Sequence, residues 1–178
     1  MRESSGLRMT LTLLIIGGVC GALLAVFNGL TAPVIEARDA AEFMEALESF
    51  FPAVDSYDIQ TVDGETFYTI TDSGGAFLGV IGKGKASGYG GAILYDLALD
   101  NTGSIIGIRI SSQGETPGIG DVITRDTYQN LITGLNYNDP NFTSDNRDYM
   151  VTGASISTGG MLRSLRALMD IAGANYFN

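Results

Sequence analysis

The 178-residue chain contains no histidine and no tryptophan, and it has a single cysteine, Cys20. The lack of histidine removes the commonest general base and the commonest metal ligand in proteins. One cysteine excludes an intrachain disulfide framework and any zinc or iron–sulfur site built from several cysteines of this chain. Basic residues are also few, 10 against 20 acidic ones, giving a formal net charge of −10. Nucleic-acid binding, which requires a basic surface, is therefore not expected.

Glycine, by contrast, is abundant, with 24 residues that gather in a few short segments. Because glycine has no Cβ atom, it lets the backbone come close to another group. These segments are therefore candidate binding sites. The hydrophobic content of 45% is enough for a packed core, and the length fits one domain plus an appendage.

The appendage is an uncharged run of 24 residues from Met9 to Ala32. About 20 apolar residues are enough for a helix to cross a bilayer. A secretory signal peptide is the competing interpretation, but its apolar stretch usually covers about 7–15 residues and ends at a small-residue cleavage site. The run is longer and lacks a convincing site of that kind. We therefore expect an uncleaved transmembrane helix over residues 9–32.

Charges beside the predicted span indicate its orientation. Arg2 and Arg8 precede it, whereas the residues that follow carry no net positive charge. The positive-inside rule places residues 1–8 in the cytoplasm and the rest of the chain outside, as a single-pass protein of the cell membrane. Beyond Arg8 the chain holds 8 basic and 19 acidic residues, a net charge of −11. Such a charge disfavours adhesion of the outer part to anionic lipids.

Gly17 and Gly21 form a G-x-x-x-G pattern inside the predicted span. Small residues at this spacing allow two helices to approach closely within a membrane. We therefore expect this face to contact another subunit, although such patterns also occur by chance in a flexible span. Cys20 lies beside them and is interpreted as a small apolar residue.

A second helix is predicted directly after the span, over residues 33–52. Pro33 either ends the span or begins the new helix, and Pro52 stops it. Apolar residues from Ala40 to Phe51 recur at helical spacing on one face, and most glutamates fall on the other. We expect this segment to connect the membrane helix, directly or with a kink, to an outer domain over residues 53–178.

The outer part shows four strand patterns, rich in aromatic and β-branched residues and separated by short turns. They cover Thr66–Thr71, Ala76–Ile81, Ala92–Leu99 and Ser104–Ser111. Because the connections are short, neighbouring strands should be antiparallel. Helical patterns follow at Asp121–Leu135 and Gly159–Ala174. The predicted fold class is α+β, an antiparallel sheet with flanking helices.

Three glycine-containing segments interrupt this pattern. In the first, GKGKASGYGG over residues 82–91, Ser87 stands where a dinucleotide-binding G-x-G-x-x-G would need its last glycine, and no G-K-[ST] closes a Walker motif. Lys83 and Lys85 beside flexible glycines suit an anionic ligand, and a plain hairpin loop is the alternative. Tyr89 could stack on a flat ring or fill the core.

The second segment is GETPGIGD, over residues 114–121. It contains the turn-forming pair Pro117-Gly118 and an acidic helix start at Asp121. On its own it predicts a loop with a helix cap.

The third segment, VTGASISTGG over residues 151–160, holds four hydroxyl side chains: Thr152, Ser155, Ser157 and Thr158. A serine-hydrolase elbow would need glycine where Ser157 stands, and without histidine a Ser-His triad is impossible. The segment directly precedes the last predicted helix, so its N–H groups and the helix dipole suit a phosphate group. A serine or threonine that only caps the helix, Ser157 above all, is the alternative.

In order and spacing, these features resemble the G subunit of the Rnf electron-transport complexes, whose FMN-binding domain is shared with the C subunit of the sodium-pumping quinone reductases. The resemblance covers nearly the whole chain. It includes the span that runs into LTAPVIEARDAA, SGYGG at residues 87–91, ETPGIGD at residues 115–121, and the hydroxyl-rich segment.

The resemblance implies a covalent cofactor. In that family the residue after the alanine of the C-terminal motif carries FMN through a phosphoester, installed by a separate flavin transferase that uses FAD. The matching residue is Ser155, where the family usually has threonine. The family often has aspartate six residues earlier; Tyr149 stands there, and Asp148 lies one place before it. The glycines of the first two segments would provide slim backbone beside the isoalloxazine ring.

The FMN-binding residues implied by the resemblance come from all three segments. They are Ser87, Gly88, Tyr89, Gly90, Glu115, Thr116, Pro117, Gly118, Gly120, Thr152, Gly153, Ala154, Ser155 and Ser157. No catalytic residue and no metal site is expected.

The resemblance also implies a function. The family links oxidation of reduced ferredoxin to reduction of NAD, coupled to Na⁺ or H⁺ movement. A flavin that passes single electrons would make this chain a relay rather than a site of substrate turnover. Its partners would be the other membrane subunits of the complex, the flavin transferase and the lipid bilayer. Two alternatives are a flavin-free structural or assembly subunit and a free-standing extracytoplasmic flavoprotein.

Overall fold

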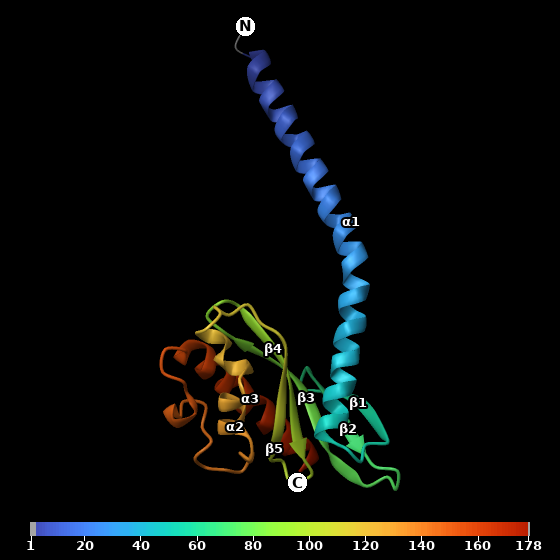
Figure 1. Cartoon of the computed structure of the whole chain (residues 1–178), viewed down its shortest axis with the longest axis vertical. Coiled ribbons are helices and arrows are strands. Elements are labelled where there is room, and N and C mark those ends of the chain that lie inside the picture. Colours follow the sequence, from blue (N-terminus) through green and yellow to red (C-terminus); the bar gives the residue numbers. More distant parts are fainter. Residues whose placement is uncertain (1–2, 178) are drawn as a thin grey trace. The chain divides into compact units, whose positions relative to one another are not determined.

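The computed structural model of the protein describes residues 3–177 (Figure 1). The chain divides into two compact units, one ending at Met44 and the other beginning at Glu45. The first unit is part of one long helix, α1, which covers Glu3–Phe50. The second unit holds the last turns of that helix, all five strands and the remaining helices.

Helix α1 passes through Pro33 without a break. The expectation that the membrane helix continues directly into the following segment is therefore confirmed, and Pro33 does not begin a separate helix. A proline inside a helix removes one backbone hydrogen bond, and the good helix formers on both sides let the helix continue around that single gap.

Residues 6–50 contain the one helix in the described part of the chain that is long and apolar enough to cross a membrane. Every large apolar side chain from Leu7 to Ile35 is more than half exposed, on all sides of the helix. A helix that is apolar all round is typical of a membrane span.

The sheet of the second unit is an antiparallel meander with the strand order β1-β2-β3-β4-β5. Its strands are β1 (Ser56–Val62), β2 (Glu65–Thr71), β3 (Phe77–Ser87), β4 (Ala92–Asp100) and β5 (Ile105–Ser112). The predicted antiparallel pairing is confirmed. Strand β1 was missing from the sequence prediction because it is a sheet edge whose residues are almost all exposed, so no buried face marks it.

Strand β3 extends through residues 82–87 of the first glycine segment, which the sequence analysis had taken to interrupt the strand pattern. A Cβ atom at Gly84 would lie 2.2 Å from the ring of Tyr95 on β4, and one at Gly82 would lie 2.9 Å from the ring of Phe67 on β2. These two glycines therefore make room for aromatic rings across the sheet. They do not form a flexible loop.

The helical segments also differ from their predicted bounds. The expected helix at residues 121–135 is two short pieces, η1 (Gly120–Thr124) and α2 (Asp126–Ile132), separated by an extended residue, Arg125. A short turn, η2 (Arg147–Tyr149), follows. The last helix, α3 (Ser155–Tyr176), begins four residues before its predicted start. The hydroxyl-rich segment thus belongs largely to the helix.

The two faces of the sheet are covered differently. Helix α3 packs on one face, where its Leu162, Leu165 and Met169 are fully buried in the main hydrophobic core. On the other face, Phe50 at the end of α1 lies against Gly107 and the following Phe51 lies against Gly79. At the start of α3, Gly160 touches the carbonyl oxygen of Ser87, the last residue of β3. This contact brings the hydroxyl-rich segment to the end of β3.

Candidate functional site

The three glycine-containing segments meet at one cavity of about 300 Å³. It is lined by Tyr89 after β3, by Glu115, Thr116, Ile119 and Gly120 before and in η1, and by Gly153, Ala154, Ser155, Ile156 and Ser157 at the start of α3. Eight of the fourteen residues predicted from the resemblance line it. The other six are Ser87, Gly88, Gly90, Pro117, Gly118 and Thr152, which lie in the same segments but outside the lining.

Glu115 ties the three segments together. Its carboxylate is 6% exposed, and each oxygen has its own donor. The backbone N–H of Gly90 donates to Oε1 at 2.9 Å, and the hydroxyl of Ser157 donates to Oε2 at 2.5 Å. A buried carboxylate requires such donors, because an unpaired buried charge is costly. The loop after β3 and the first turn of α3 are thereby fixed to one side chain.

Several glycines of the first two segments surround this carboxylate. A Cβ atom at Gly88 would lie 2.0 Å from Oε1 of Glu115, and one at Gly120 would lie 2.1 Å from Oε2. A Cβ atom at Gly90 would lie 2.0 Å from the carbonyl oxygen of Gly114. The slim backbone at these positions accommodates Glu115 and the neighbouring loop, whereas the sequence interpretation had assigned it to a bound ring.

The four hydroxyls of the third segment have different surroundings. Thr158 is fully buried; it donates to the carbonyl of Ala154 and accepts from the N–H of Val151. Ser157 is 1% exposed and is engaged by Glu115. Ser155 and Thr152 are exposed, and Ser155 is the one of these two that lines the cavity.

The prediction that Ser157 caps the last helix is wrong. Because α3 begins at Ser155, Ser157 lies inside its first turn, and the N-cap position is Ala154, whose side chain makes no capping hydrogen bond. The first N–H groups of a helix have no acceptor within the helix. At the start of α3 these N–H groups are available to bind an anion, and the helix dipole favours a negative charge at this end.

No side chain among the described residues that line this cavity carries a positive charge. The lysines of the first segment lie elsewhere. Lys83 is 3.6 Å from Asp96 on β4, and its ammonium lies over the ring of Tyr68. The pair does not form the anion site that the sequence suggested.

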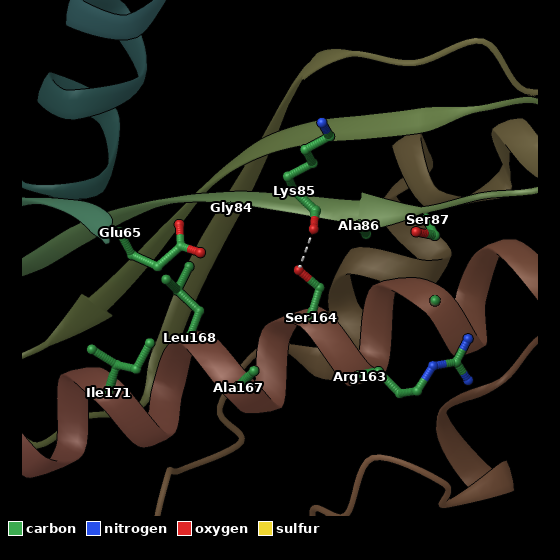
Figure 2. A pocket seen from close by; sticks show the side chains of 11 residues that line it. Glu65, Gly84, Lys85, Ala86, Ser87, Arg163, Ser164, Ala167, Leu168 and Ile171 are labelled. Carbon is green, nitrogen blue, oxygen red and sulfur yellow. Dashed lines mark hydrogen bonds between the residues drawn. The ribbon is translucent and has the colours of Figure 1, made fainter. Parts of the chain in front are cut away.

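A second cavity, of about 330 Å³, lies between β3 and α3 (Figure 2). The hydroxyl of Ser164 donates to the carbonyl of Lys85 at 3.0 Å and pairs with the hydroxyl of Tyr95 at 2.7 Å. Burial raises the pKa of Tyr95 above its usual range. In Figure 2 the side chain of Lys85 extends away from Ser164, so its ammonium does not enter this cavity. The first segment lines this cavity with residues 84–87 and the third with Gly160, whereas no residue of the second segment lines it.

Sequence reasoning missed two residues of the first cavity, Ile119 and Ile156. They are 54% and 57% exposed, and Tyr89 beside them is 74% exposed. Large apolar side chains in a glycine- and hydroxyl-rich segment normally turn inward. An isoleucine between two serines was the available signal for Ile156.

Asp148 and Tyr149, near the position where the family has aspartate, lie in η2. The side chain of Asp148 is exposed, and its N–H is held by Asn146 at 2.9 Å. The ring of Tyr149 packs edge-on against that of Phe142, with 5.9 Å between the ring centroids. Tyr149 therefore serves the packing of this loop, and Asp148 presents the carboxylate to solvent.

Residues 88–170 match the family model of the FMN-binding domain, and this stretch includes every residue that lines the cavity. The chain is 32% identical over 149 residues to the G subunit of the ion-translocating oxidoreductase complex of Cereibacter sphaeroides, covering 78% of this chain and 68% of that protein. It is 25% identical over 177 residues to the corresponding G subunit of Methanosarcina acetivorans, covering 94% of each chain.

Among solved structures, the crystal structure of Shewanella oneidensis NqrC has the same fold, with a TM-score of 0.51 at 19% identity over 72% of this chain and 71% of that one. The α+β prediction is thereby confirmed. The chain belongs to the family of G subunits of ion-translocating oxidoreductase complexes. With one candidate span among its described residues, it is a single-pass membrane protein.

Proposed function

We propose that this chain is an electron-relay subunit of a membrane-bound ferredoxin:NAD oxidoreductase, with FMN attached through its phosphate to the hydroxyl of Ser155. The observation that carries the proposal is the position of Ser155: an exposed hydroxyl at the uncapped start of a 22-residue helix, in the wall of the cavity where three motif segments meet. The family model over residues 88–170 supports FMN as the ligand.

The helix start in the wall of the cavity fits this linkage. An ester of FMN with serine is a phosphodiester and keeps one negative charge. The N–H groups at the start of α3 can hold one such charge without a lysine or arginine. Free FMN carries more charge and would call for a cation, which the lining residues do not provide.

The exposed apolar side chains fit the flat ring. Tyr89, Ile119 and Ile156 come from three different segments and border the same cavity. Apolar and aromatic side chains of this kind bind planar ligands with large contact area. When bound, FMN supplies the capacity to accept and release single electrons. The chain's own residues would anchor the phosphate and border the ring at the surface, where a neighbouring subunit can approach.

The remaining parts of the proposal concern the assembly. Residues 1–8 would lie in the cytoplasm, residues 9–32 in the bilayer, and residues 53–178 outside. The neighbouring membrane subunits would exchange electrons with the flavin, and the complex would couple electron flow to movement of Na⁺ or H⁺. A flavin transferase would install the FMN, with the exposed Asp148 available for its recognition.

The intact mass of the chain purified from its native host tests the attachment. We expect an increment of one FMN less one water in the wild type and in Ser155→Thr, and none in Ser155→Ala. Thr152→Ala is the matched control, since it removes the other exposed hydroxyl of the segment and should keep the increment. Loss of the increment in Thr152→Ala, with retention in Ser155→Ala, would place the flavin on Thr152 and refute the assignment.

A further inference from the structure

We infer that Glu115 is a fixed negative charge that lowers the reduction potential of the flavin bound in this cavity, an inference that rests on the proposed function. Glu115 is the one charged side chain among the described residues that line the cavity. The residue is nearly fully buried, and water screens a buried charge far less than an exposed one.

The surroundings of Glu115 suit an ionised carboxylate. Oε1 accepts from the N–H of Gly90, and Oε2 accepts from the hydroxyl of Ser157. An ionised carboxylate is an acceptor only, so one donor for each oxygen matches this state. The backbones of Gly88 and Gly120 pack so closely against the two oxygens that a Cβ atom at either glycine would overlap one of them. The charge is therefore fixed in position as well as in sign.

The physical effect follows from Coulomb's law. Reduction adds electrons to the flavin, and a nearby fixed negative charge makes this addition less favourable. No cation in the cavity lining offsets the effect. Ser155, where the phosphate would be attached, and Glu115 line the same cavity, which keeps the charge close to the bound group. The flavin should consequently be a stronger reductant in this site than in a neutral one.

A second role for Glu115, holding the loops together, must be separated from its charge. Glu115→Gln does this, because glutamine keeps an acceptor oxygen for the N–H of Gly90. Its amide can donate to the hydroxyl of Ser157, which can also act as an acceptor. The shape and both hydrogen bonds are thus retained while the charge is removed. Glu115→Asp retains the charge, and Ser157→Ala retains the charge but removes one donor.

The experiment is a spectroscopic redox titration of the flavinylated full chain in detergent. Dithionite supplies two electrons per flavin and is itself oxidised to sulfite, and the buffer supplies the protons. We expect a higher midpoint potential for Glu115→Gln than for the wild type. Glu115→Asp should stay near the wild-type value. The midpoint potential of Ser157→Ala should equal the wild-type value or lie below it, because the carboxylate of Glu115 loses one hydrogen-bond donor.

Three outcomes would overturn the inference. If the midpoint potential of flavinylated Glu115→Gln equals that of the wild type, Glu115 holds the loops together and does not tune the flavin. An equal upward shift in Glu115→Asp would make geometry, rather than charge, the cause. Loss of flavin in Glu115→Gln, with flavin retained in Glu115→Asp, would make the charge a requirement for attachment instead. A different observation would refute the proposed function itself: a wild-type chain, purified from its native host, that shows no flavin absorbance before any titration.

Discussion

Replacing Gly160 by alanine should destabilise the second unit, although the same change in most helices is stabilising. An alanine in a helix interior gains about 1 kcal/mol over glycine. At Gly160, however, the new Cβ atom would lie 1.9 Å from the carbonyl oxygen of Ser87, whereas real Cβ contacts are essentially never under 3.0 Å. The oxygen is backbone in β3 and cannot turn aside, so α3 must move away from the sheet by more than an ångström.

The neighbouring Gly159 is the matched control. A Cβ atom there would lie 3.4 Å from the guanidinium of Arg163 and 3.4 Å from the terminal methyl of Met150, and both belong to flexible side chains. Gly159→Ala should therefore be stabilising by up to about 1 kcal/mol. Forcing extra volume into a packed contact costs about 1–3 kcal/mol. Gly160→Ala should be less stable than the wild type. Because both variants share the gain in helix propensity, the two should differ in free energy of unfolding by the packing cost of about 1–3 kcal/mol.

Urea unfolding followed by tyrosine fluorescence measures this difference. All 8 tyrosines lie between Tyr57 and Tyr176, within the second unit, and the chain has no tryptophan to mask them. The signal therefore excludes the long N-terminal helix. Equal midpoints for Gly160→Ala and Gly159→Ala, or a more stable Gly160→Ala, would show that α3 does not press on Ser87 as described.

Four further outcomes are expected. Protease added to intact spheroplasts should digest the outer domain and spare an N-terminal tag, because the flanking charges place the N-terminus inside; digestion only after lysis would reverse the orientation. Replacing both Gly17 and Gly21 by leucine should reduce co-purification of the other subunits while the outer domain keeps its flavin, and undiminished co-purification would make the pattern incidental. Asp96→Ala should lower the free energy of unfolding by about 1.5–3 kcal/mol, because the hydrogen bond that Nε of Arg109 donates to this buried carboxylate at 2.8 Å is lost. Lys83→Met should cost under about 1 kcal/mol in the same urea assay, since its side chain is 38% exposed.

The sheet was largely predictable because its signals are local. Runs of aromatic and β-branched residues with short turns defined four strands and their antiparallel order, and all four were confirmed. Strand β1 was not predicted, although Tyr57 and Ile59 alternate with Asp58 and Gln60; it lies at the sheet edge, where almost all of its residues are exposed. Residues 82–87, taken as an interruption of the strand pattern, are strand, and Gly84 faces the Tyr95 ring, a contact between partners on different strands that periodicity does not reveal.

The candidate site was predictable as a set of segments and not as a geometry. The resemblance named the segments that line the cavity. The hydrogen bond between Glu115 and Ser157 joins residues 42 positions apart, and nothing local to either residue signals it. The start of α3 was placed four residues late, at Gly159. Both glycines lie inside the helix, and Gly160 is required by the approach of α3 to β3.

The two hydrogen bonds that join Glu115 to Gly90 and Ser157 also bear on whether the chain folds before or after its flavin is attached. In the folded unit, Ser155 lies at a helix start whose first turn is joined through Glu115 to the loop at Gly90. In a chain that has not yet folded, the same serine is one hydroxyl among many in a mobile segment. If a flavin transferase attaches FMN to Ser155 and recognises only this folded arrangement, then only correctly folded outer domains would receive the flavin. The yellow colour of a subunit would then indicate that its outer domain was folded when the cofactor was attached. Misfolded copies would stay colourless and could be told apart by that alone.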